Sequence, residues 1–243
     1  RDGFKHVYLY RNNGELVRQI TKGDWVVERI NAIDETKGLI YFQGRKDTPL
    51  ESHVYSVALD GSDITRLSKA DQFHSATFSS DASVYVDSHS TANTPAQVSL
   101  HGADGSMITW LDENKVDQNH PLYDFTDDWV KPEFGSIKAQ DGSDLQYRLY
   151  KPKELRGKHP VIVYLYGGPH VQMVTNSWGD NRGLLMQYWV NKGYVVFTLD
   201  NRGSYNRGKA FEDPIFKKMG FVEVDDQITG VTFLRTLDYV DPQ

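Results

Sequence analysis

The sequence predicts two architectures in succession: an all-β first half built from repeated hairpins, then an α/β second half with a parallel sheet. Two observations carry this prediction. A plan of strand, glycine turn and strand occurs three times before residue 115. After residue 160, a helical stretch joins two apolar runs rich in β-branched and aromatic residues, and parallel strands need such a crossover.

The first half contains an internal repeat whose members share the same turn chemistry. The repeated segments are 7–21, 54–68 and 97–111. Their turns are Asn13-Gly14, Asp60-Gly61 and Asp104-Gly105. These dipeptides accept the positive φ values of tight hairpins, so each segment is predicted to be a pair of antiparallel strands.

Further strand pairs lie between the hairpins, at 25–33 with 38–44 and at 74–79 with 83–89. The turn glycines are 47 and 44 residues apart, so one period holds four strands. That period is typical of β-propeller blades, and a meandering sandwich with similar turns is the alternative. Because so few blades cannot close a ring, we expect more of them upstream in a longer protein.

The pattern changes near residue 120, where Asn119-His120-Pro121 interrupts the strands. Residues 133–150 then form a predicted strand pair that turns at Asp141-Gly142. We place the boundary at residue 125, which gives one domain over residues 1–125 and a second over residues 126–243.

The second domain begins its parallel layer with two buried-strand patterns. Residues 161–168 read VIVYLYGG and residues 194–200 read YVVFTLD. The helical stretch between them has apolar positions Leu184, Leu185, Tyr188 and Trp189 and ends at Gly193. We expect 161–166 to pair in parallel with 195–199.

A last helix is predicted at about 222–237, before Asp241-Pro242. Apolar residues recur in it at helical spacing, so we expect one face to be buried. The expected buried residues are Val224, Ile228, Val231, Leu234 and Leu237.

Composition limits the classes of function. The net charge is 27 − 33 = −6 and no dense basic run occurs, which argues against a nucleic-acid or anionic-membrane partner. The chain has no cysteine and no apolar stretch near the roughly 20 residues that span a bilayer. None of the eight histidines forms H-x-H or H-x-x-x-H, so we expect neither a metal site nor a cofactor.

Four segments, in order along the chain, carry a resemblance to a known family. They are 1–10 (RDGFKHVYLY), Tyr166-Gly167-Gly168-Pro169, Asp200-Asn201-Arg202-Gly203-Ser204 and 220–227 (GFVEVDDQ). With them the chain resembles the prolyl oligopeptidase (S9) family of serine peptidases, in its dipeptidyl peptidase IV branch. The resemblance implies C-terminal β-propeller blades over 1–125 and the first half of an α/β-hydrolase catalytic domain over 126–243.

The resemblance also implies a function for the longer protein. It would be a serine exopeptidase that releases N-terminal dipeptides, with proline or alanine second, from peptide substrates. A periplasmic or secreted location is implied, and a homodimeric parent is left open. The alternatives are an acylaminoacyl peptidase or endopeptidase of the same family, and a non-catalytic binding protein with the same two domains.

Tyr166 is the one catalytic residue that the resemblance places in this chain. It matches the tyrosine whose hydroxyl stabilises the oxyanion of the tetrahedral intermediate. A Gly-x-Ser-x-Gly turn, which presents the serine nucleophile, is absent; Gly179 and Gly183 flank Asn181 instead. By the resemblance, the nucleophile, Asp and His all lie beyond Gln243, so we expect this chain alone to be inactive.

Three other signals favour ordinary structural roles. Gly203 to Lys209 has P-loop spacing, but Ala210 stands where magnesium coordination needs a hydroxyl. His170, beside the diglycine, is expected to be a partly exposed loop residue, with a position lining the active-site cleft as the alternative. Asp127-Asp128 and Asp225-Asp226 are expected on solvated faces or at helix starts.

Overall fold

The computed structural model describes residues 2–242, and of residues 180 and 181 only the backbone. Arg1, the first residue of the decapeptide that resembles a propeller segment, and Gln243 lie outside this range. The chain forms two compact units. The first contains the chain up to Lys115 together with Thr175–Trp178 and Asn206–Gly208, and the second contains the remainder. The expected boundary at residue 125 stays a prediction about the domains of the longer protein.

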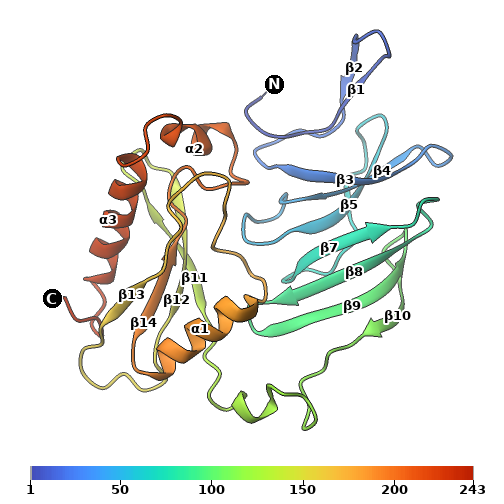
Figure 1. Ribbon diagram of the computed structural model, residues 1–243. Helices are drawn as coiled ribbons and strands as arrows, with labels where there is room; N and C mark the ends of the chain where they lie inside the picture. Colours follow the sequence, from blue (N-terminus) through green and yellow to red (C-terminus); the bar gives the residue numbers. More distant parts are fainter. Residues whose placement is uncertain (1, 243) are drawn as a thin grey trace. The chain divides into compact units, whose positions relative to one another are not determined.

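The first unit is a series of antiparallel sheets (Figure 1). A two-stranded sheet consists of β1 (Tyr8–Tyr10) and β2 (Leu16–Gln19). The next sheet consists of β3 (Val27–Asp34), β4 (Leu39–Gly44), β5 (His53–Ala58) and β6 (Thr65–Arg66). The third consists of β7 (Phe73–Phe78), β8 (Val84–Thr91), β9 (Thr94–Gly102) and β10 (Met107–Asp112). Consecutive strands pair in each four-stranded sheet, as predicted for propeller blades.

The turn glycines have the backbone conformation that tight hairpin turns require. Gly14, Gly61 and Gly105 have φ values of 87°, 87° and 89°, in the left-handed region that glycine enters without strain. The blade interior is aromatic: Trp25 stacks on Phe42, and Phe42 stacks on Tyr55. The prediction of hairpins at these dipeptides is therefore confirmed.

The second unit is built on one mixed sheet of order β11-β12-β14-β13. Its strands are β11 (Glu133–Lys138), β12 (Asp144–Tyr150), β13 (Val161–Val163) and β14 (Val195–Leu199). Its α-helices are α1 (Asp180–Asn191), α2 (Lys209–Glu212) and α3 (Val222–Leu234), with 3₁₀ turns η1 (Tyr123–Phe125) and η2 (Asp213–Ile215). β13 and β14 pair in parallel, which confirms that prediction, although β13 ends three residues earlier than expected.

Helices α1 and α3 cover opposite faces of β14, the strand at the centre of this unit (Figure 1). Val195, Phe197 and Leu199 pack in the cluster that includes Leu234 of α3. Val196 points the other way and packs with Met186 and Val190 of α1. Every residue of β14 is buried, as its run of apolar residues, interrupted only by Thr198, predicts.

The prediction of which α3 face is buried is wrong for three of its five residues; Leu234 is buried as predicted, and Leu237, just after the helix, packs partly buried against the same cluster. Val224, Ile228 and Val231 are exposed, and the buried residues of α3 are Glu223, Asp226, Gly230 and Leu234. The helix turns this face to the sheet because a small residue allows close contact: a Cβ on Gly230 would lie 3.1 Å from both Leu199 and Phe197. The spacing of apolar residues along α3 does not by itself reveal which face of the helix packs against the sheet.

Of the four apolar positions identified in the α1 stretch, Trp189 is partly buried and packs against the sheet-facing cluster. Leu184, Leu185 and Tyr188 are exposed, whereas Met186 and Val190 are buried. Gly193, with φ 91°, follows the C-cap as predicted.

Candidate functional site

Tyr166 lies just beyond the carboxyl end of β13. The parallel ladder continues for one bond past the strand, from the Tyr164 N–H to the Phe197 carbonyl at 2.8 Å. The Tyr166 side chain is 54% exposed. Its ring passes over Gly168, where a Cβ would lie 3.0 Å from the Tyr166 ring. The diglycine therefore leaves room for this tyrosine to extend away from the strand.

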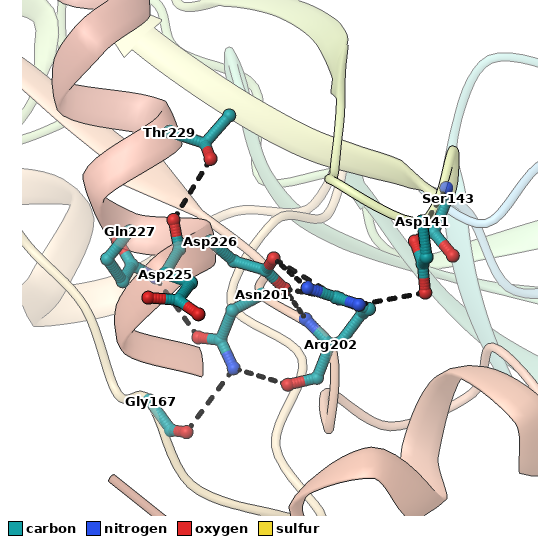
Figure 2. A network of polar contacts seen from close by, with 9 residues as sticks. All are labelled: Asp141, Ser143, Gly167, Asn201, Arg202, Asp225, Asp226, Gln227 and Thr229. Atoms are coloured by element: carbon teal, nitrogen blue, oxygen red, sulfur yellow. Dashed lines mark hydrogen bonds and ion pairs between the residues drawn. The ribbon is translucent and has the colours of Figure 1, made fainter. Parts of the chain in front are cut away.

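Asn201 connects the Tyr166 loop to the end of β14 (Figure 2). Its Nδ2 donates to the Gly167 carbonyl at 3.3 Å and to the Arg202 carbonyl at 2.7 Å. Its Oδ1 accepts a 3.0 Å bond from Gln227, which also donates to the Leu199 carbonyl at 3.1 Å. The amide of Asn201 thus joins three segments: the loop after β13, the end of β14 and helix α3.

Arg202 and Asp226 form a buried, multidentate ion pair behind this loop (Figure 2). Nη2 donates to Oδ1 at 2.7 Å, Nε to Oδ2 at 3.0 Å and the backbone N–H to Oδ2 at 2.8 Å. The remaining Nη1 donates to Asp141 at 2.8 Å. Fork geometry of this kind is specific to arginine.

The charges of this network stabilise one another. Hydrogen bonds to Asp226, and then to Asp141, raise the pKa of Arg202 despite its burial. Burial raises the pKa of Asp141, but hydrogen bonds from Ser143 and Arg202 outweigh burial and hold that pKa below its usual value. The expectation that Asp226 is solvated is wrong, because its side chain pairs with Arg202 and is 1% exposed. Asp225, Asp127 and Asp128 are exposed, as expected.

Asp200 fixes the far end of the same loop. Its carboxylate accepts the backbone N–H groups of Met173 at 2.8 Å and Val174 at 3.0 Å. His170, between the two attachment points, is exposed and has its ring edge-on to Tyr205 at 5.9 Å. The expectation of an exposed loop histidine is confirmed.

The glycine-rich stretch after β14 is explained by backbone geometry. Gly203 has φ 100°, and a Cβ there would lie 2.2 Å from Ile215. Its N–H donates to the Phe211 carbonyl at 2.7 Å. These contacts require glycine for turn geometry and packing, in agreement with the structural interpretation of the P-loop spacing.

The site therefore offers one exposed phenol on a loop that is attached at one place to the buried Asn201 amide and at another to the buried Asp200 carboxylate. A phenol O–H held at a strand end can donate a hydrogen bond to an anionic oxygen. The sequence reasoning singled out Tyr166 but not the supporting roles of Asp200, Asn201 and Asp226, whose only sequence signal was membership of the resembling motifs.

Two family models match separate parts of the chain. The dipeptidyl peptidase IV N-terminal region matches residues 1–96, and the prolyl oligopeptidase family matches residues 182–243. The first therefore falls in the predicted propeller blades and the second in the predicted hydrolase half.

Individual proteins match along nearly the whole chain. Human dipeptidyl peptidase 8 is 34% identical over 91% of this chain, which covers 26% of that protein. Dipeptidyl peptidase 4 of Trichophyton equinum is 30% identical over 93% of this chain and 30% of its own length. The crystal structure of dipeptidyl peptidase 4 from Porphyromonas gingivalis superimposes with a TM-score of 0.88 at 31% identity, over 99% of this chain and 33% of that one. The chain thus spans about a quarter to a third of these relatives. Across residues 2–242, none of the helices has the length and apolar character needed to cross a membrane.

Proposed function

The chain belongs to the prolyl oligopeptidase family, in its dipeptidyl peptidase IV branch, and from this membership we propose that it is part of a serine peptidase that releases N-terminal dipeptides. We include in the proposal a preference for proline or alanine as the second residue. Peptides are then the substrates. The relatives reported above, all named dipeptidyl peptidases, favour this activity over that of an acylaminoacyl peptidase or endopeptidase.

The observation that carries the proposal is the placement of Tyr166. Its hydroxyl belongs to an exposed ring at the end of a parallel strand, on a loop that Asn201 and Asp200 attach to the end of β14. Attack on a peptide carbonyl places negative charge on its oxygen. A donor already positioned for that charge lowers the barrier without reorganising during the reaction. Tyr166 is proposed to be that donor.

The rest of the chemistry is proposed to come from other parts of the longer protein. Residues 1–243 contain no Gly-x-Ser-x-Gly sequence. The serine nucleophile, its histidine base and the orienting aspartate would meet Tyr166 across the active site. A periplasmic or secreted location and a homodimeric state also belong to the proposal. Cell fractionation and light scattering of the full-length protein would test them.

Replacing Tyr166 by Phe in the full-length protein tests the assignment. The ring and its contact with Gly168 remain, while the only O–H is lost. We expect kcat for a Gly-Pro or Ala-Pro amide to fall about 10²–10³-fold, since one oxyanion donor is worth that much, with KM little changed.

Tyr164→Phe provides the matched control, because it removes a hydroxyl two residues earlier from a ring that packs near Trp189 at 6.2 Å. We expect its kcat to stay within about threefold of the unaltered enzyme, an effect of about 0.6 kcal/mol. If Tyr166→Phe retains full kcat and only lowers the melting temperature, Tyr166 is structural and the assignment is wrong.

A further inference from the structure

Three titratable side chains meet on one face of the sheet β7–β10. His74 of β7 lies directly opposite His89 of β8 in the strand register. Asp87 is two residues before His89, so its side chain is on the same face. Side chains at opposed and alternate positions of paired strands lie within contact distance, and the sheet therefore brings these three together.

The three side chains are buried and close to one another. Their exposed fractions are 1% for His74, 2% for Asp87 and 8% for His89. His74 Nδ1 lies 2.7 Å from Asp87 Oδ2, and His89 Nδ1 lies 3.5 Å from the same oxygen. One ligand atom from each residue lies within 4.8 Å of the other two.

The hydrogen bonds of His74 determine which of its nitrogens faces the cluster. Its Nε2 lies 2.8 Å from the Lys69 carbonyl, which can only accept, so Nε2 carries a proton. Nδ1 then faces the Asp87 carboxylate, another acceptor. Either a second proton or a metal ion must stand between these two atoms.

A proton would satisfy only part of the cluster. It would join His74 Nδ1 to Asp87 Oδ2 and leave two further atoms without a bond. Asp87 Oδ1 and His89 Nδ1 are buried and have no hydrogen-bond partner within residues 2–242. Buried polar atoms of native proteins almost always have partners, and those of this cluster converge on one place.

We propose that His74, Asp87 and His89 bind one divalent transition-metal ion of the zinc class. The ligands are His74 Nδ1, His89 Nδ1 and the Asp87 carboxylate, and imidazole with carboxylate is a donor set that zinc accepts. Ligands at about 2.0–2.1 Å around a tetrahedral ion lie about 3.3 Å apart. The observed separations of 2.7 and 3.5 Å lie on either side of that value.

The surroundings of the cluster support the proposal. Metal-bound histidines usually donate their other N–H to a carbonyl or carboxylate, as His74 does to Lys69. The rings are held in a row, because His74 stacks on His89 at 5.5 Å and His89 packs against Trp110 at 5.7 Å. Ligands locked by packing require little rearrangement on binding.

A cavity provides access and the fourth ligand position. It has a volume of about 450 Å³ and is lined by the three ligands together with Gln97, Ser99 and Trp110, among others. Water in this cavity completes the tetrahedron, in the manner of zinc sites with three protein ligands. The bound ion ties β7 to β8 and stabilises this sheet.

The test begins with the purified chain after dialysis against a chelator. Calorimetric titration with Zn²⁺ should show one equivalent bound, and Co²⁺ should give the visible ligand-field bands of a tetrahedral site. Zn²⁺ should raise the melting temperature, whereas Mg²⁺, which needs six oxygen ligands, should not.

Paired variants identify the ligands. His89→Phe keeps a ring between His74 and Trp110 but removes both nitrogens. We expect its Zn²⁺ affinity to fall more than about 100-fold, since loss of outer-shell partners alone costs about 10–100-fold. His101→Phe is the control: it makes the same change in the same cavity, at a ring that stacks on Tyr85 and bonds Ser99, and its affinity should be unchanged.

Several results would overturn the proposal. One is absence of stoichiometric Zn²⁺ binding, in which case a buried imidazolium–carboxylate pair explains the cluster. Another is binding that His89→Phe leaves intact. If His89→Phe does not fold, the ligands are identified instead from histidine ¹⁵N NMR spectra of the unaltered chain with and without Zn²⁺. Zn²⁺ must shift Nδ1 of His74 and His89 and leave His101 in place; any other pattern contradicts the site.

Discussion

At the scale of single residues, Arg202 neutralises a carboxylate buried inside the second unit. It gives Asp226, which is 1% exposed, three separate donors. Removing one partner of a buried ion pair leaves an uncompensated charge. We expect Arg202→Met to lower the free energy of unfolding by about 3–5 kcal/mol in urea denaturation.

The matched control is Arg156→Met, which removes an exposed ion pair with Glu154 at 2.9 Å. Exposed substitutions of this kind change stability by about 0.5 kcal/mol or less. If both variants unfold at the same urea concentration, the buried pair contributes nothing beyond an exposed one and the inferred role of Arg202 is wrong.

Asp34 gives the chain a component of stability that depends on pH. Its carboxylate accepts the Thr36 hydroxyl at 2.6 Å and the backbone N–H of Lys37 at 3.0 Å. These bonds, that of Thr36 first, lower the pKa of Asp34 to about 2. Because the unfolded carboxyl titrates near pH 4, the contribution is complete above about pH 4 and is lost as pH falls toward 2.

Urea titrations at pH 5 and pH 2.5 measure this dependence. Asp34→Asn keeps an oxygen acceptor but cannot be protonated in that range, so its midpoint should fall less between the two pH values than that of the unaltered chain. If the urea midpoint falls equally in both proteins, Asp34 does not contribute to the pH dependence of stability.

Sequence reasoning at this scale located one residue of the site but not its support. Tyr166 was singled out by the resemblance, and the structure places it beside the diglycine at the end of β13, 54% exposed; its catalytic role stays a prediction. Asp226 was misassigned since its partner Arg202 is 24 residues away. His74 and His89 face each other only through strand register, which spacing rules within one segment do not contain.

At the scale of elements, two helical glycines can be compared to distinguish the effect of close packing from the effect of helix propensity. One has free space around it and the other lies against the sheet. A Cβ on Gly183 of α1 meets nothing within 4 Å, whereas one on Gly230 of α3 meets Leu199 and Phe197 at 3.1 Å. Gly183→Ala should stabilise by about 1 kcal/mol through helix propensity. Gly230→Ala gains the same propensity but overpacks the contact with β14, which costs about 1–3 kcal/mol.

We therefore expect Gly230→Ala to be at least about 1 kcal/mol less stable than Gly183→Ala in urea denaturation. Equal stabilisation of the two variants would show that α3 moves away from the sheet freely. The result also bears on the site, since Gln227 of α3 holds Asn201.

The sequence predicted which segments are helices and strands more accurately than how they are oriented. The existence of α3 follows from its period, but its buried face follows from Gly230 and Asp226. β13 is shorter than its apolar run because the chain after Tyr164 leaves β14 to form the Tyr166 loop. The buried face of a helix and the length of a strand are determined by contacts with other segments, and the sequence of one segment does not reveal those contacts.

At the scale of the whole molecule, the order of architectures was predictable because each has its own period. Hairpins recurring every 44 to 47 residues indicated blades, and the apolar run, helix and apolar run indicated the parallel crossover. The sheet orders confirm both. Catalytic capacity depends instead on groups that the proposed function places elsewhere in the longer protein.

We expect residues 1–243 alone to be inactive. The chain should not hydrolyse Gly-Pro or Ala-Pro chromogenic amides and should not react with a fluorophosphonate probe, because an oxyanion donor without an activated hydroxyl forms no covalent intermediate. Mass spectrometry after probe treatment checks this, with the full-length protein as the positive control. Stoichiometric labelling of a serine in this chain would contradict the proposal.

The length of one hydrogen bond has a consequence for how the longer enzyme would choose substrates. Tyr166 stands two residues past the last ladder bond, and the Asn201 amide holds its neighbour Gly167 at only 3.3 Å. If this single bond lets the loop sample several orientations before substrate binds, turnover scales with the fraction of molecules in which the phenol is aimed correctly. If that fraction is about one tenth, a substrate whose side chains press the loop into place gains about tenfold in rate. The enzyme would then discriminate between peptides mainly through kcat, because kcat depends on how often the loop holds the productive orientation. The affinities for different peptides would differ little.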